Sequence, residues 1–407
     1  MRPPLAAFFT LAFAGAAFAD SQNFNRIERG RYLAVLGDCA ACHTAPRGKP
    51  FAGGLALQTP FGTLVAPNIT PDPGTGIGNM TDAEFLASLH DGRGRGGRRL
   101  YPAMPYPAYT KMNDDDVLAI RAYLATVAPV HNAVVSNQLP FPFNVRLSIA
   151  IWNALNFTPG RYRQNPQKST EWNRGAYIAE GAAHCGTCHT PKTILGGDKN
   201  DHALTGATLQ GWLAPDITNN VGKGIGGWSK DDLIQYLKSG ANNWTVATGP
   251  MGEAVTHSTS QMTDEDIEAL AAYLKDSGTG GSAPKPNPVA VNDNTMRAGA
   301  AIYEDNCAAC HKDMGSGEAH LFPRLAGSAI VQSDDSTTLV RVVLLGTRAV
   351  STAAMPTAPA MPAFDWRLND AQVAAVLTYI RNSWGNAAGP VSADDVARQK
   401  GAFAKAP

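Results

Sequence analysis

Three stretches of the chain repeat apolar and polar residues with the period of an α-helix, and they open in the same way. They read MNDDDVLAIRAYLATV from Met112, MTDEDIEALAAYLKDS from Met262 and LNDAQVAAVLTYIRNSW from Leu368. Each opens with an Asn or Thr followed by acidic residues, an N-cap whose charge suits the helix dipole. The apolar residues recur on one face. The pattern therefore predicts three similar helices, each packed inward through that face.

Each of these helices closes a longer repeated unit. RGRYLAVLGDCAACHTAP from Arg29 matches RGAYIAEGAAHCGTCHTPK from Arg174, and VAPNITPDPGTGIG from Val65 matches LAPDITNNVGKGIG from Leu213. A third unit keeps RAGAAIYEDNCAACHKD from Arg297 but continues through LFPRLAG in place of an APNIT-like segment. In every unit a leading helix, a cysteine motif, a Gly- and Pro-rich loop, a middle helix and the closing helix follow in this order. The predicted fold class is all-α, with three tandem domains of which the third is shorter.

The repeats and the composition between them give the expected boundaries. The domains cover residues 20–128, 166–277 and 295–386, separated by an interdomain brace at 129–165 and a Gly- and Pro-rich linker at 278–294, and followed by a tail at 387–407. The apolar helix of the brace is too short to span a bilayer. We expect it to support the domains; contact with a partner subunit or a lipid surface is the alternative. The tail is expected to be a frayed polar terminus, with a weak amphipathic anchor as the alternative.

The first residues have the composition of an export signal. Arg2 precedes an apolar stretch from Leu5 to Ala17, and the small residues Ala17 and Ala19 flank Phe18. This order is typical of a secretory signal peptide, here residues 1–19, cleaved after Ala19. Such a leader implies export to an oxidising compartment, where free cysteines normally pair as disulfides.

Charge gives little indication of a partner. Basic and acidic side chains number 34 each, so no overall field favours nucleic acid or another polyanion. The run GRGRGGRR at 92–99 is the local exception. We expect it to be a solvated loop, with binding of a haem propionate or docking of a partner as the alternatives.

All six cysteines lie in three C-x-x-C-H motifs, at 39–43, 185–189 and 307–311. A zinc site needs further soft ligands nearby, and the next cysteine after Cys42 is Cys185. A thioredoxin-like dithiol does not need a histidine directly after its second cysteine. Covalent haem explains the pattern, because each sulfur adds to a porphyrin vinyl group and the adjacent histidine becomes the proximal iron ligand. The spacing predicts three haem c groups, bound by Cys39, Cys42, Cys185, Cys188, Cys307 and Cys310, with His43, His189 and His311 on the irons.

The sixth iron ligand decides whether such a site transfers electrons or binds substrates, and methionine closes the iron and raises its potential. Each unit has a methionine between its middle and closing helices, in a Pro-rich stretch: Met104, Met251 and Met361. Met355 is the rival to Met361, and His257 or His320 could replace Met251 in a bis-histidine site. Met112 and Met262, at the start of their closing helices, are expected to pack in the core.

The ordered set of RGRYL, CAACHT, FGTLVAPNITPD, GIG and PAMPY, its second copy, and the ending VLTYIRNSWGN resemble one family over nearly the whole chain. This is the three-haem cytochrome c subunit of periplasmic, membrane-associated bacterial dehydrogenases for alcohols, aldonic acids or sugars. The resemblance implies three tandem cytochrome c-type domains and a periplasmic, peripherally membrane-bound protein. It also implies a large partner subunit containing PQQ or FAD, and delivery of electrons to ubiquinone or another respiratory acceptor.

The residues themselves agree with a role in electron transfer rather than catalysis. No dinucleotide fingerprint lies between a strand and a helix, and no nucleophile and base pattern or carboxylate metal cluster is present in the sequence. We therefore expect this chain alone to oxidise no substrate. The alternatives are a self-contained multihaem enzyme such as a cytochrome c peroxidase, or a haem-based gas sensor. Both need one iron with an open or displaceable position, which the three methionines disfavour.

Overall fold

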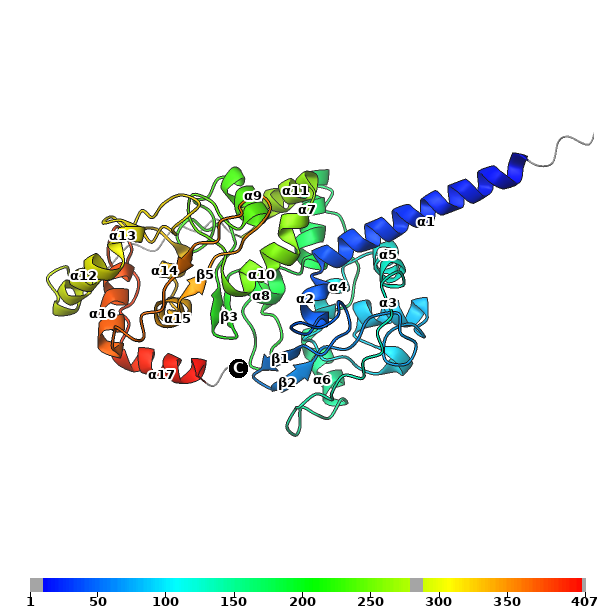
Figure 1. Ribbon diagram of the computed structural model, residues 1–407, viewed down its shortest axis with the longest axis horizontal. Helices are drawn as coiled ribbons and strands as arrows, with labels where there is room; N and C mark the ends of the chain where they lie inside the picture. Colours follow the sequence, from blue (N-terminus) through cyan, green and yellow to red (C-terminus); the bar gives the residue numbers. More distant parts are fainter. Residues whose placement is uncertain (1–9, 279–287, 405–407) are drawn as a thin grey trace, which may run out of the picture. The chain divides into compact units, whose positions relative to one another are not determined.

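The computed structural model describes residues 10–278 and 288–404. Its contacts divide the chain into two compact units, Met1–Ile151 with Thr158–Tyr162, and Trp152–Phe157 with Arg163–Pro407. The first unit contains the first cysteine motif and the second unit contains the other two (Figure 1). We call the regions around the three motifs the first, second and third domains. Among the described residues, none of the helices combines the length and hydropathy that a membrane span needs.

The first domain follows the predicted order of elements. They are α1 (Thr10–Leu36), α2 (Cys39–His43), β1 (Ala56–Thr59), β2 (Gly62–Val65), α3 (Asp82–Asp91), α4 (Tyr106–Tyr109) and α5 (Asp114–Leu124). The middle helix α3 begins with a capping box formed by Thr81 and Glu84, and the closing helix α5 begins at the N-cap Asn113. Residues 1–9 of the predicted signal peptide lie outside the described residues, and cleavage after Ala19 stays a prediction.

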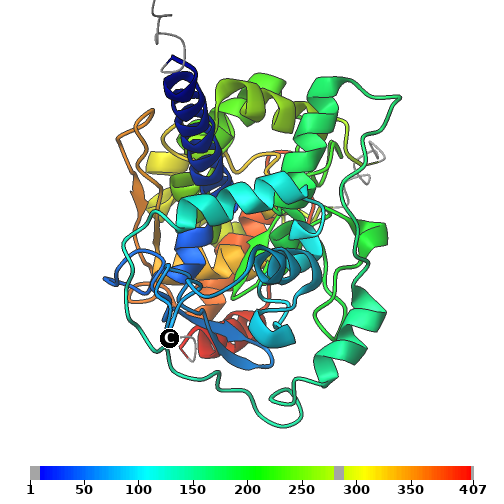
Figure 2. The same cartoon turned by 90° about the vertical axis from the view of Figure 1, so that its right-hand side faces the viewer.

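All three domains are built on the same crossing of the leading helix over the closing helix. Figure 2 shows α5 running across the end of α1. At this crossing a Cβ atom on Gly30 would lie 1.8 Å from the carbonyl oxygen of Ala119, so the backbones approach as closely as only glycine permits. The equivalent pairs are Gly175 with Ala269, and Gly299 with Ala375, at 1.9 and 2.2 Å.

The second domain repeats this order and adds a π-helical turn after its leading helix. Its elements are α7 (Thr170–Tyr177), a π-helical turn (Ile178–Ala182), α8 (Gly186–His189), β3 (Ala207–Leu209), β4 (Trp212–Ala214), α9 (Lys230–Ser239), α10 (Gly249–His257) and α11 (Asp264–Lys275). The closing helix α11 begins at the predicted N-cap Thr263. The helix α10 replaces the Pro-rich loop that the sequence suggests, since the proline of this segment lies in the first turn, where a missing N–H is harmless. In the predicted brace, α6 (Ser148–Asn156) forms a separate helix.

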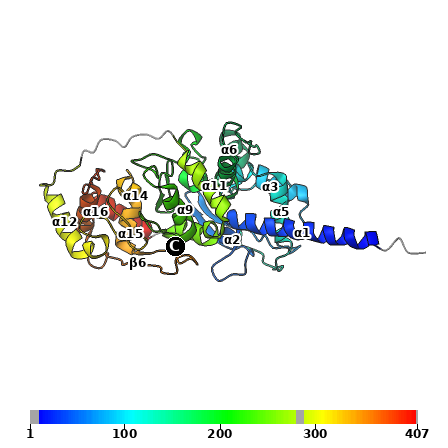
Figure 3. The same ribbon diagram turned by 90° about the horizontal axis from the view of Figure 1, so that it is seen from above.

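The third domain is built from helices and one short strand pair. Its elements are α12 (Asn294–Asn306), α13 (Ala308–His311), α14 (Ala329–Gln332), α15 (Thr337–Leu345), β5 (Thr347–Arg348), β6 (Ala360–Met361), α16 (Asp370–Arg381) and α17 (Ala393–Phe403). Figure 3 shows α12, α14, α15 and α16 gathered together. Their shared core contains the fully buried side chains Val340, Val373 and Leu377.

The expectation of a frayed polar tail is wrong for most of that segment. Helix α17 opens with a capping box between Ser392 and Asp395, and Val396 is 0% exposed within the core of the third domain. Phe403, near the end of the helix, packs against the same core. The apolar contacts of Val396 and Phe403 and a good N-cap therefore stabilise a helix that looks weakly amphipathic in sequence.

The all-α prediction needs one correction, because each domain also contains a two-stranded antiparallel sheet. The pairs are β1 with β2, β3 with β4, and β5 with β6. In the second hairpin Gln210 and Gly211 have φ angles of 51° and 74°, the pair of positive values that a tight two-residue hairpin turn requires. Strands of two to four residues are too short to show a clear alternating pattern.

Candidate functional site

Each C-x-x-C-H motif forms a short helical turn just after its leading helix ends. In the first domain α1 ends at Leu36, and Asp38 adopts a left-handed conformation with φ of 48° before α2 begins at Cys39. In the second domain His184, with φ of 40°, precedes Cys185 in the same way. One helical turn places residues i, i+3 and i+4 on one side, so the two thiols and the imidazole of each motif share a face. The six cysteines all lie in the described residues, and no two of them form a disulfide.

The three motif histidines have the same kind of hydrogen-bond partner, a prolyl carbonyl group. Nδ1 of His43 lies 2.8 Å from the carbonyl oxygen of Pro67. The equivalent pairs are His189 with Pro215 at 2.7 Å, and His311 with Pro323 at 2.9 Å. Because a carbonyl can only accept, Nδ1 carries the proton and Nε2 keeps its lone pair. The geometry therefore prepares Nε2 of each histidine to bind a metal.

The protonation of these histidines suits the same role. Burial lowers the pKa of His43, His189 and His311 below its usual value, and the hydrogen bond to the prolyl carbonyl opposes this effect only in part. The imidazoles are therefore neutral at pH 7, which is the form that ligates iron.

The thiols do not have the properties of a redox dithiol. Burial raises the pKa of Cys39 and of Cys185 to about 12, and it raises the pKa of Cys307 to about 11. A thioredoxin-like motif depends on a lowered thiol pKa. The first cysteine of each motif therefore lacks the lowered pKa that this rival interpretation needs, whereas haem attachment needs two sulfurs and one imidazole.

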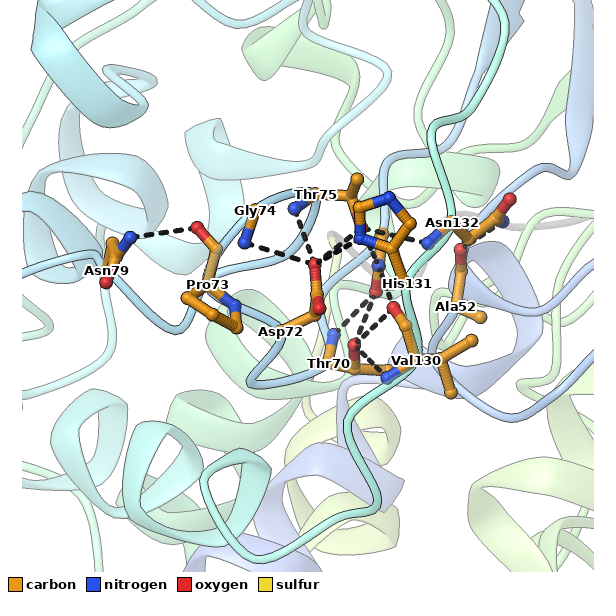
Figure 4. A network of polar contacts seen from close by, with 11 residues as sticks. Ala52, Thr70, Asp72, Pro73, Gly74, Thr75, Asn79, Val130, His131 and Asn132 are labelled. Carbon is orange, nitrogen blue, oxygen red and sulfur yellow. Dashed lines mark hydrogen bonds and ion pairs between the residues drawn. The ribbon is translucent and has the colours of Figure 1, made fainter.

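A polar network behind Pro67 holds the carbonyl that His43 uses. The side-chain oxygen of Asn68 accepts hydrogen bonds from the N–H and the hydroxyl of Thr70, at 2.9 and 2.8 Å. Its amide group donates to the carbonyl of Val130 at 2.7 Å and to the hydroxyl of Thr75 at 3.0 Å. Figure 4 shows Thr70, Thr75 and Val130 within this network. The APNIT segment thus has a structural role: it closes the loop that carries the prolyl carbonyl.

The other two domains hold the equivalent loop in different ways. In the second domain Asp216 replaces Asn68 and accepts from the N–H and the hydroxyl of Thr218, both at 2.7 Å. In the third domain the side chain of Asn386, which is 1% exposed, donates to the carbonyl of Leu325 at 3.0 Å and accepts from the N–H of Gly327 at 2.8 Å. In the third domain the loop is therefore held by Asn386, from the end of the domain, and not by the residue that follows the proline.

The predicted distal methionines lie between the middle and closing helices, but in three different local structures. Met104 lies in the loop before α4, Met251 in α10, and Met361 on β6, where it pairs with Thr347. All three side chains are half-buried. Met361 packs against the third-domain core, and Cys307 of the same domain packs there too. The Pro-rich loop predicted around Met251 is wrong, because this residue belongs to a helix.

The remaining candidates behave as follows. Met112 and Met262 are 1% and 5% exposed and pack in their cores, as predicted. Met355, the rival of Met361, is half-buried in a loop. His257 and His320 are exposed, and the bis-histidine site stays the alternative to ligation by Met251.

Sequence reasoning missed the supports of the three histidines. The prolyl carbonyls of Pro67 and Pro215 could have been found, because the repeated A-P-[N/D]-I-T segment lies at the same place in two domains. LFPRLAG contains the third proline, Pro323, without the rest of the segment. The role of Asn386 has no local signal, since it lies far along the chain from that proline.

Comparisons with known proteins point to one family. A profile described as Cytochrome c matches residues 27–128, 173–278 and 296–384. The chain is 42% identical to the gluconate 2-dehydrogenase cytochrome c subunit of Pantoea cypripedii, over 95% of this chain and 92% of the relative. It is 38% identical to the cytochrome c subunit of the alcohol dehydrogenase (quinone) of Gluconobacter oxydans, over 94% and 84%. It is 39% identical to the fructose dehydrogenase cytochrome subunit of Gluconobacter japonicus, over 91% and 82%.

The three matched segments coincide with the three domains, and each contains one C-x-x-C-H motif with its carbonyl-bound histidine. The sequence resemblance to cytochrome c subunits is therefore confirmed. The chain belongs to the cytochrome c family and contains three copies of its domain.

Proposed function

We propose that the chain is an electron-transfer subunit with three haem c groups, which relays electrons from a dehydrogenase subunit containing PQQ or FAD to ubiquinone or another respiratory acceptor. The observation that carries this proposal is the threefold occurrence of a C-x-x-C-H turn whose histidine is fixed through Nδ1 by a prolyl carbonyl. The relatives are named for gluconate, alcohol and fructose at similar identity. The substrate is therefore a property of the partner subunit rather than of this chain.

In this proposal every site residue has one task. The thioether bonds are made by Cys39 and Cys42, Cys185 and Cys188, and Cys307 and Cys310, and the proximal ligands are His43, His189 and His311. Met104, Met251 and Met361 take the distal positions, which closes each site and raises its potential. When bound, haem c supplies reversible one-electron chemistry at iron. The protein orients the imidazoles, excludes water and sets the distance between neighbouring sites.

The partner is tested by reconstitution. The complex purified from its source should contain a large subunit from which PQQ or FAD can be extracted. The chain alone should oxidise no alcohol, aldonic acid or sugar, and adding it to the large subunit should enable reduction of ubiquinone. Substrate oxidation by this chain alone would contradict the proposal.

Carbon monoxide distinguishes electron transfer from the peroxidase and gas-sensor alternatives. Closed histidine–methionine sites bind little CO in the reduced state, whereas a catalytic or sensing haem has a displaceable ligand. The optical spectrum of the reduced protein should therefore change little under CO. A full CO complex at one of the three haems would favour an enzyme or a sensor.

We also propose a periplasmic location with peripheral contact to an anionic membrane, through one surface of the first unit. Phe141, Leu147 and Ile151 of this surface are 80%, 72% and 65% exposed. Arg95 and Arg98 of the predicted solvated loop are exposed as well. No acidic residue occurs between positions 117 and 170. Apolar side chains next to arginines are the combination that favours binding to negatively charged lipid.

One arginine joins the two parts of this surface. The guanidinium of Arg146 lies 4.6 Å from the ring centroid of Tyr101 and donates to the carbonyl of Arg99. The hydroxyl of Tyr101 donates to the carbonyl of Phe143 at 2.9 Å. The apolar segment is thereby attached to the Arg-rich loop.

Vesicle binding tests the surface. Binding of the holoprotein to phosphatidylcholine vesicles should increase when phosphatidylglycerol is added, and the variant Leu147→Ser/Ile151→Ser should weaken it about tenfold. Val291→Ser is the control, because Val291 is 82% exposed but lies outside the surface. Equal binding to both lipid compositions, or an equal loss in the control, would contradict this surface and point to a protein partner instead.

A further inference from the structure

A valine of the third domain fills a gap between two glycines of the second. A Cβ atom on Gly252 would lie 2.6 Å from Cγ1 of Val350, and one on Gly240 would lie 2.3 Å from its Cγ2. Both distances are shorter than real Cβ contacts, so the two glycines leave room for this one side chain. Gly252 directly follows Met251 in α10. The third domain therefore touches the helix that carries the proposed distal ligand of the second haem.

Backbone pairing fixes the valine in place. The N–H of Val350 donates to the carbonyl of Ala247 at 3.2 Å, and Ala349 forms an antiparallel bridge with Thr248. On its other side Ala349 donates to the carbonyl of Pro359 at 2.8 Å, two residues before Met361. The same short segment is thus bonded to the stretch before α10 and to the stretch before the third distal methionine.

A second contact supports the start of α10. A Cβ atom on Gly249, its first residue, would lie 2.8 Å from the ring of Trp212. The guanidinium of Arg341 in the third domain lies 4.9 Å from the centroid of the Trp212 ring and 5.0 Å from that of Phe403. Such cation–π contacts hold the tryptophan against the helix start. The third domain therefore supports the Met251 helix at two places.

We infer that Val350 is a positioning residue for the second haem: from the third domain, it holds α10 where Met251 can ligate iron. This inference rests on the proposed function, in which Met251 is that ligand. One consequence is that the second and third haem sites are structurally coupled. The segment 349–350 is bonded both to the stretch before Met361 and to the stretch before the Met251 helix. A change at Val350, although it lies in the third domain, should then alter the haem of the second domain.

Complementary substitutions test the contact. Gly252→Ala should collide with Val350 and displace α10, so one haem of the reduced holoprotein should bind CO about tenfold faster. Val350→Ala removes both methyl groups and should loosen the same haem. The double variant Gly252→Ala/Val350→Ala has the new methyl group in the vacated space. It should regain slow CO binding and the methionine-to-iron charge-transfer absorption of the oxidised protein.

Two further variants distinguish an error in the role of Val350 from an error in the assignment of Met251 as the iron ligand. Val331→Ala removes a buried side chain of the third-domain core, and it should leave CO binding by the second haem unchanged. Met251→Ala should open that haem directly. If Met251→Ala opens no haem, the ligand assignment of the proposed function is wrong. If Met251→Ala opens one haem but the double variant shows no recovery over the single ones, or Val331→Ala acts like Val350→Ala, the inference about Val350 is wrong.

Discussion

The second and third domains perform the same local task with different residues. Both present a histidine whose Nδ1 is bound by a prolyl carbonyl, but that carbonyl lies 26 residues after the histidine in the second domain and 12 after it in the third. The second domain spans the longer distance with a hairpin and an Asp216 turn, whereas the third uses Asn386 from its far end. The proximal geometry is thus the constant part, and the chain that supports it varies.

The helix crossing shows the same contrast. Arg174 beside Gly175 forms a two-bond ion pair with Asp266 at 2.7 and 2.6 Å, and the first domain pairs Arg29 with Asp116. In the third domain Ala298 and Gln372 occupy these positions. The third domain instead packs Tyr303 with Tyr379 and Trp384, at ring separations from 4.9 to 5.5 Å. The close glycine contact is common to all three crossings, whereas the Arg–Asp ion pair occurs only in the first and second domains.

The largest effect should come from the feature that the domains share. Gly175→Val and Gly299→Val place side-chain atoms against a carbonyl oxygen that a Cβ atom alone would approach to 1.9 and 2.2 Å. Each variant should lose more than about 4 kcal/mol of unfolding free energy or fail to mature. Chemical denaturation of the holoprotein measures this. Gly389→Ala is the control, because no atom lies within 4 Å of the new Cβ; tolerance of valine at either crossing would disprove the shared architecture.

The next effect should differ between the domains. Asn386→Ala leaves the carbonyl of Leu325 and the N–H of Gly327 without their buried partner, and it should cost about 3 kcal/mol. Asp216→Ala removes bonds within one half-buried turn and should cost about 1 kcal/mol. Both costs are read from denaturation, and the potential of the affected haem reports on its histidine. Equal costs would show that the two supports are equivalent after all.

The smallest effect concerns the Arg174–Asp266 ion pair of the helix crossing. Arg174→Ala leaves the carboxylate of Asp266, whose side chain is 9% exposed, without its ion pair, and it should lower the unfolding free energy by about 2 kcal/mol. The double variant Arg174→Ala/Asp266→Gln, which imitates the third domain, should recover part of this loss. If the double variant is less stable than Arg174→Ala, the residues of the third-domain crossing cannot replace the ion pair in the second domain.

Much of this organisation could be predicted from the sequence, because it depends on local patterns. The N-caps Asn113 and Thr263 predict the start of their closing helices, and the spacing of the cysteines and histidines predicts the haem motifs. Other features depend on contacts between distant residues. The helix around Met251, the packed helix α17 and the role of Asn386 are set by tertiary contacts that leave no periodic signal. The sequence therefore predicts which side chains bind haem, but not which residues support those side chains.

The mass of the denatured protein tests the central claim most directly, because only covalently bound haem survives unfolding. Intact mass spectrometry of the mature protein should give a mass that exceeds the polypeptide by three haem groups, and all six cysteines should resist alkylation because thioether bonds occupy their sulfurs. Fragmentation should assign one haem to each pair: Cys39 with Cys42, Cys185 with Cys188, and Cys307 with Cys310. A mass with two haems or fewer, or a cysteine pair that still reacts as free thiols or as a disulfide, would contradict the three-haem relay.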